Sequence, residues 1–180
     1  MSANTNGRSA ANLVMRVCDI GEFFRALRVR MRFGELSRAP LRLLRIEVRG
    51  DGAECEWMAR AADSWDDGLP NHVSECHVSM QALEDAIAVR ELLLRTLPDV
   101  ESAALRVFRL GVTGDPELVI IGTVAREERP IRYFHSVAMR AKLLGLQFWL
   151  EDGILGVIPQ ENLTAEAQAG YTGDLLSMGK

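Results

Sequence analysis

The sequence holds few of the residues and motifs on which most enzymes depend. It contains three cysteines and three histidines in 180 residues, and no phosphate-binding loop, dinucleotide fingerprint or nucleophile elbow accompanies them. The cysteines are odd in number and widely spaced, which excludes a disulfide framework. We therefore predict a protein that is not an enzyme and has no cofactor.

Long apolar segments are also missing. No run approaches the roughly 18 residues of a membrane-spanning helix. The polar N-terminal residues contain no apolar stretch after Arg8 of the kind that a secretory signal requires. These absences predict a cytoplasmic protein without a membrane span.

A basic excess is lacking too. The net charge is −4 and aromatic residues make up 6%, whereas nucleic-acid-binding proteins usually combine basic patches with aromatic side chains. Residues 1–50 hold ten Arg and four acidic residues, a net of +6, and residues 51–180 hold eleven basic and twenty-one acidic residues, a net of −10. This asymmetry predicts a protein partner or self-association rather than nucleic acid.

Composition and length predict one folded domain with loose ends. Hydrophobic residues make up 48% and charged residues 26%, which is ordinary for a globular protein. Residues 1–12 are small and polar, which predicts a disordered N-terminal tail. The hydrophobic pattern is lost after residue 160, so we expect a single domain over 13–160 and a C-terminal tail over 161–180.

The first helix and the first hairpin follow from hydrophobic spacing. Apolar residues recur at helical spacing over 20–33. If Asp51-Gly52 forms a two-residue type I′ turn, Gly52 adopts a positive φ and Val48 lies opposite Cys55. Cys55 then points inward as a small core residue.

The remaining elements alternate in the same way. Residues 61–79 show no hydrophobic period, which predicts a long surface loop. Ser79 is predicted to cap the following helix, and a turn at 152–153 is predicted to place Leu150 opposite Leu155. After the loop we expect a helix at 80–97, strands at 103–110 and 117–126, a helix at 131–144 and a hairpin around 152–153.

The element order is thus three α-ββ units. It predicts an α+β fold in which a mainly antiparallel sheet is packed by helices. Read from the second strand, the order is also that of a split βαβ, ferredoxin-like core. The first hairpin conflicts with that core. Its second strand would be the central first strand of the unit, which already has two neighbours, and the hairpin would add a third. The two arrangements remain alternatives.

A helix, two strands, a helix and a strand are predicted in that order over residues 83–150. A strand signature and a Gly-hydrophobic pair fall within this segment, at Leu118-x-Ile120-x-Gly122-x-Val124 and Gly145-Leu146. In these features the segment resembles BON domains. The resemblance implies a phospholipid- or protein-binding module of a usually exported kind.

Two groups of side chains are candidate binding residues. His72, Cys76 and His77 offer ligand types that Zn²⁺ takes, but their spacing matches no paired zinc motif, so a solvated polar loop is the favoured interpretation. Arg25 and two further arginines, Arg28 and Arg32, share a face of the first helix. That face could meet an acidic partner or pair with the acidic remainder of the same molecule, and we favour the second.

Together these observations predict a non-enzymatic protein-interaction or assembly module that self-associates. The warrant is the absence of catalytic motifs, the charge asymmetry and the strand edges that a sheet of hairpins must cover or pair. The alternative is a small-molecule or metal-binding protein that uses loop 61–79 as a lid.

Overall fold

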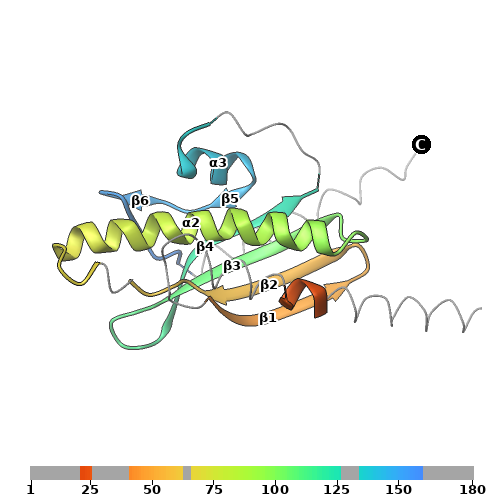
Figure 1. Cartoon of the computed structure of the whole chain (residues 1–180), viewed down its shortest axis with the longest axis horizontal. Coiled ribbons are helices and arrows are strands. Elements are labelled where there is room, and N and C mark those ends of the chain that lie inside the picture. Colours follow the sequence, from red (N-terminus) through yellow and green to blue (C-terminus); the bar gives the residue numbers. More distant parts are fainter. Residues whose placement is uncertain (1–20, 26–40, 63–65, 127–133, 160–180) are drawn as a thin grey trace, which may run out of the picture.

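A five-stranded sheet carries one long helix along one of its faces (Figure 1). This computed structural model describes residues 21–25, 41–62, 66–126 and 134–159. The sheet order is β1-β2-β3-β4-β5, and of its neighbouring pairs only β2 and β3 run parallel. Its strands are β1 (Arg42–Arg49), β2 (Gly52–Met58), β3 (Ser102–Leu110), β4 (Pro116–Ala125) and β5 (Leu146–Gln147). The helices are α2 (Asn71–Thr96) and α3 (Val137–Leu143), and a small second sheet pairs β6 (Leu150–Glu151) with β7 (Ile154–Leu155).

The predicted α+β fold with a mainly antiparallel sheet is confirmed. The three α-ββ units are not confirmed as an arrangement, since the last hairpin forms the separate β6–β7 sheet. The ferredoxin-like alternative is wrong: a split βαβ unit separates its two parallel strands, whereas β2 and β3 are directly paired from Gly52↔Ser102 to Met58↔Phe108. α2 is the crossover that joins these two parallel strands.

The core lies between α2 and the inward face of the sheet. No Gly or Pro interrupts α2, so its apolar residues form a continuous buried side. Alternation along β2 and β3 sends every second side chain to the helix and its neighbours to the opposite face. The largest fully buried side chains include Trp57, Leu83, Leu92, Leu93, Leu105 and Ile120. Strands predicted at 103–110 and 117–126 are confirmed within one residue at each end.

The first hairpin forms, but its turn lies one residue earlier than predicted. Arg49 pairs with Gly52 and Val48 pairs with Ala53, so the turn residues are Gly50 and Asp51. Gly50 has φ +58°, and Gly52 is an ordinary strand residue without a positive φ. A positive φ at the first turn residue alone is the pattern of a type II′ turn. Because the register moves by two residues from Arg45 onward, the side chains there keep their predicted faces, and Cys55 is fully buried as expected. Before Arg45 a bulge shifts the register again.

The predicted loop at 61–79 is wrong from residue 71 onward, because α2 begins at Asn71. Pro70 precedes the helix, and Ser79 is a buried residue within it rather than its cap. The first turns of α2 pack against β7. This tertiary contact supports helix in a stretch whose own hydrophobic pattern is weak.

The C-terminal elements follow the prediction more closely. α3 begins at Val137 rather than 131 among the described residues, with the Ser136 hydroxyl accepting a hydrogen bond from the Met139 N–H at 3.3 Å. Residues 134–136 are not helical. The turn at Asp152 and Gly153 has φ values of +49° and +86°, and Leu150 pairs with Leu155. That hairpin is confirmed with the predicted register.

Two glycines let β4 and β5 approach each other. A Cβ on Gly122 would lie 2.3 Å from the Gly145 carbonyl oxygen, and Gly145 itself has φ +92°. Any side chain at Gly122 would therefore collide with backbone rather than with a movable side chain. Gly145 also follows the C-cap of α3, and it adopts the left-handed conformation typical of the residue after a helix.

Several predictions lie outside the described residues or are left open by them. The tails at 1–12 and 161–180 and most of the first helix fall outside, and the domain limits stay predictions. Residues 21–25 are helical. Within the described ranges, no helix is long and apolar enough to cross a membrane.

Candidate functional site

The predicted arginine face is described only in part. Arg25 is exposed on the short helix at 21–25, and Phe23 of the same helix is fully buried in the core. Phe23 thus anchors the segment that carries Arg25. Arg28 and Arg32 lie outside the described residues, so the arginine face stays a prediction.

The three candidate metal ligands lie on a helix, where they do not converge. His72 and Cys76 are one turn apart on α2, with 3.8 Å between Nε2 and Sγ. His77 instead contacts Asp66, with 3.1 Å between Nδ1 and Oδ1. Neighbouring helix residues point about 100° apart, which separates Cys76 from His77. Among the described residues, no group of three or more His, Cys, Asp or Glu side chains could hold a metal ion.

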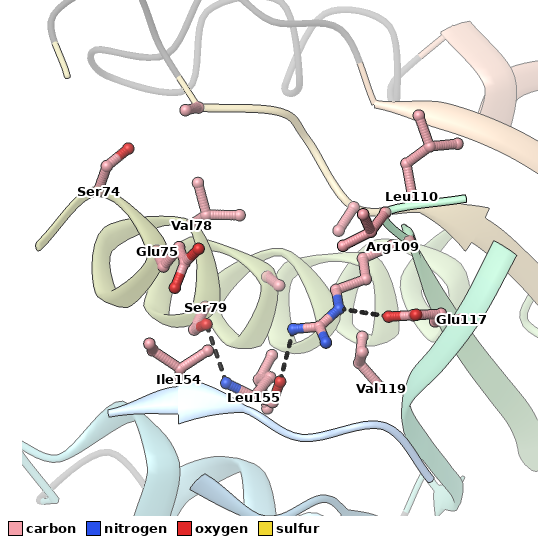
Figure 2. A pocket seen from close by; sticks show the side chains of 15 residues that line it. Ser74, Glu75, Val78, Ser79, Arg109, Leu110, Glu117, Val119, Ile154 and Leu155 are labelled. Carbon is pink, nitrogen blue, oxygen red and sulfur yellow. Dashed lines mark hydrogen bonds and ion pairs between the residues drawn. The ribbon is translucent and has the colours of Figure 1, made fainter. Parts of the chain in front are cut away.

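A pocket of about 400 Å³ opens between the first half of α2, the β3–β4 hairpin and β7 (Figure 2). Much of its wall is apolar. The apolar lining residues are Ala59, Ala62, Val78, Ala82, Leu110, Val112, Val119, Ile154 and Leu155. The polar ones are Ser74, Glu75, Ser79, Arg109 and Glu117, and Gly111 completes the wall. Part of the predicted lid segment 61–79 therefore does line a pocket, although most of it does so as a helix.

An ion pair crosses the strand wall of the pocket. Arg109 and Glu117 are opposite each other in the β3–β4 register, and Arg109 Nε donates to Glu117 Oε2 at 2.9 Å. Arg109 Nη1 also donates to the Leu155 carbonyl oxygen at 2.7 Å, as Figure 2 shows. The guanidinium thus ties the β3–β4 hairpin to β7, and its charge is already compensated by Glu117.

A β-bulge creates the apolar part of that wall. The β3–β4 register shifts after Val107, so Val119 is the extra residue on β4. A bulge adds local twist and redirects a side chain. Val119 is buried and lines the pocket.

Ser79 holds the helix wall against β7. Its hydroxyl accepts a hydrogen bond from the Leu155 N–H at 3.0 Å, which Figure 2 shows, and Ser79 is buried. Leu155 thus uses its N–H toward α2 and its C=O toward Arg109. The backbone of Leu155 in β7 thus holds α2 and β3 in place around the pocket.

Glu75 adds an unbalanced negative charge to the rim. It lies on an exposed part of α2 that lines the pocket. Within the described chain no ion pair involves Glu75, whereas Glu117 is paired with Arg109. The pocket residues therefore carry two carboxylates and one guanidinium, and the excess charge lies on the helix side.

Gly111 allows Glu117 to occupy its observed position. A Cβ at Gly111 would lie 2.5 Å from Glu117 Oε1 and 2.7 Å from its Cδ. Any larger residue would displace the Glu117 side chain. The absence of a side chain at Gly111 thus helps to keep the ion pair with Arg109 in place.

The sequence reasoning also missed a buried ion pair outside the pocket. Arg60, which follows β2, forms a two-point contact with Asp85 of α2, and Nε donates to Oδ2 at 2.7 Å. The two side chains are 3% and 4% exposed. Gln81 also donates to Asp85 Oδ1 at 3.1 Å. This contact joins the end of β2 to the middle of α2.

One sequence signal could have led to the strand wall of the pocket. The predicted turn between the strands at 103–110 and 117–126 brings Arg109 and Glu117 close to each other with opposite charges. Glu75 gave no such signal, because the segment around it read as a loop.

Comparison with known proteins gives no match: neither a protein-family description, nor a curated protein, nor a solved structure is similar to this chain. The element order of the segment that resembles BON domains is nevertheless observed, as α2-β3-β4-α3-β5. The BON resemblance itself stays a prediction.

Proposed function

We propose that this chain is a cytoplasmic, non-enzymatic binding protein whose pocket takes a small apolar molecule with a cationic amino group. The observation that carries the proposal is the pocket of about 400 Å³, with an apolar wall and an unbalanced carboxylate at its rim. Ligand pockets in proteins usually have volumes of about 300–1,000 Å³ and are mostly apolar with a few polar groups.

The lining supports an apolar ligand body. Val78, Val119 and Ile154 approach from three different elements, so a bound molecule would be covered on several sides. Burial of apolar surface contributes roughly 25 cal/mol per Å². A ligand with a polar or charged body would lose this contribution.

Charge supports a cationic head group. Arg109 is already paired with Glu117 and the Leu155 carbonyl, whereas Glu75 has its carboxylate at the rim without an ion-pair partner among the described residues. An ammonium group beside Glu75 would gain a charge-assisted hydrogen bond. A carboxylate ligand would meet a net negative rim instead.

The test is calorimetric titration with 3-phenylpropylamine, and with 3-phenylpropan-1-ol and 3-phenylpropionate as matched probes. About ten non-hydrogen atoms at roughly 0.4–0.5 kcal/mol each give a Kd of about 0.2–1 mM. We expect the amine to bind more tightly than the alcohol and the carboxylate to bind most weakly. Glu75→Gln should remove the difference between the amine and the alcohol.

Filling the pocket provides the matched control. Val78→Trp places an indole in the pocket and should raise the Kd of the amine at least about tenfold. Val73→Trp is the control, since Val73 has a similar exposure on the same helix but does not line the pocket. Equal binding by both variants, or no binding of any probe by the native chain, would contradict the proposal.

Two other functions remain as proposals of lesser support. A phospholipid- or protein-binding role of BON type is supported only by the observed element order. A self-associating assembly module is favoured by a specific observation, the eight-residue strand β1 at the edge of the sheet.

The cysteines at Cys55 and Cys76 are free, which fits the proposed reducing compartment.

A further inference from the structure

We infer that two copies of this chain associate through the outer edge of β1, paired antiparallel about Ile46. The inference is independent of the pocket. It rests on the hydrogen-bond directions of β1 and on the order of charges along it. β1 has β2 on one side and is the last strand of the described sheet on the other.

The hairpin register determines which backbone groups point outward. Arg49 and Gly52 flank a two-residue turn and therefore exchange both of their hydrogen bonds. Such pairs alternate along an antiparallel ladder, so Glu47 and Arg45 also direct their backbone groups toward β2. Ile46 and Val48 then direct their N–H and C=O groups away from β2, toward any added strand.

Outward-pointing residues can pair only with outward-pointing residues of a second copy. The two copies can therefore be related only by a two-fold axis that passes through one residue of β1. The charges along the strand distinguish the possible axes from one another. An axis at Arg45 places two arginines opposite each other, and an axis at Glu47 does the same with two glutamates. Like charges directly opposite destabilise a sheet.

An axis at Ile46 is complementary throughout the centre of the strand. Arg45 then lies opposite Glu47 of the second copy, and the symmetry repeats this pair on the other side. Opposite charges in such positions contribute roughly 0.2–1 kcal/mol per pair. An axis at Val48 would also oppose Glu47 and Arg49, but it forces pairing of the turn residue Gly50 and leaves little strand to pair.

The charged face of β1 fits the same register. Leu44, which is 43% exposed, is the extra residue of the β1 bulge, so the regular alternation toward a second copy begins at Arg45. On the charged face, the observed pairs Arg45–Glu47 and Arg106–Glu56 would join those of the second copy in one network. A charged edge normally discourages strand addition; here the alternation of charge opposes the shifted registers and favours this one.

The test uses two charge-reversal variants, each of which should associate poorly with itself but well with the other. Arg45→Glu and Glu47→Arg each create like-charge pairs in a homodimer, so sedimentation velocity at about 5–500 µM should show at least about a tenfold rise in Kd. An equimolar mixture restores both opposite-charge pairs. It should form a heterodimer with a Kd within about threefold of the native value.

Glu84→Arg on the exposed side of α2 is the control for a change of charge far from the edge, and it should leave association unchanged. Circular dichroism on each variant separates loss of association from loss of fold. A native chain that stays monomeric over the whole concentration range would overturn the inference. So would a mixture of the two reversals that associates no better than either alone.

Discussion

Replacing Asp85 by Leu should be among the most destabilising single substitutions in this chain. The carboxylate and the Arg60 guanidinium are 4% and 3% exposed and make a two-point contact. Removing one partner of such a pair leaves an uncompensated buried charge and costs about 3–5 kcal/mol. Arg60→Met should cost a similar amount, because it leaves the carboxylate buried.

The double variant Arg60→Met/Asp85→Leu should be more stable than either single variant. It removes both charges and replaces them with apolar groups of similar size, which is often close to neutral. Glu56→Ala is the control for a more exposed pair with Arg106 and should cost at most about 1 kcal/mol.

Urea unfolding followed by tryptophan fluorescence measures these differences, since Trp57, one of the three tryptophans, is fully buried in the core. With a slope of about 2 kcal/mol/M, a loss of 4 kcal/mol lowers the midpoint by about 2 M. If the double variant were as unstable as the sum of the two single variants, the reasoning about an uncompensated buried charge would be refuted.

Two further outcomes follow from close contacts and from burial. Gly122→Ala should lower the free energy of unfolding by at least about 2 kcal/mol, because the new Cβ meets the Gly145 carbonyl oxygen at 2.3 Å; an unchanged urea midpoint would contradict this. Burial raises the pKa of the Cys55 thiol to about 12, so at pH 8 this thiol stays protonated and unreactive. In a Cys18→Ser background, iodoacetamide should therefore label Cys76 in the native protein and Cys55 only after unfolding, and mass spectrometry of tryptic peptides would reveal any early labelling of Cys55.

The first hairpin shows what the sequence could and could not predict. Alternation along the strands placed Cys55 inward correctly, because a shift of two residues leaves every face unchanged. The turn was misplaced because Gly50-Asp51 and Asp51-Gly52 are both suitable turn pairs. The parallel pairing of β2 with β3, which begins at Gly52↔Ser102, keeps Gly52 in the strand, and this contact is not visible in local sequence.

The start of α2 was hidden for a related reason. Residues 71–79 have a weak hydrophobic pattern, and their helix is supported by β7, some 80 residues away in sequence. Because a loop was predicted where α2 begins, the position of Glu75 at the rim of the pocket could not be predicted either. The turn at Asp152 and Gly153 was predictable because its left-handed conformations depend on those two residues alone.

The most direct test of the proposed function is a titration of the ¹⁵N-labelled chain with 3-phenylpropylamine, followed by amide chemical shifts. We expect the largest changes at the residues that surround the pocket from three elements, Val78, Ser79, Val119 and Leu155. These changes should be lost in Val78→Trp. Shifts scattered over the surface, or confined to β1 and α3 while the pocket amides stay unchanged, would contradict the proposed function.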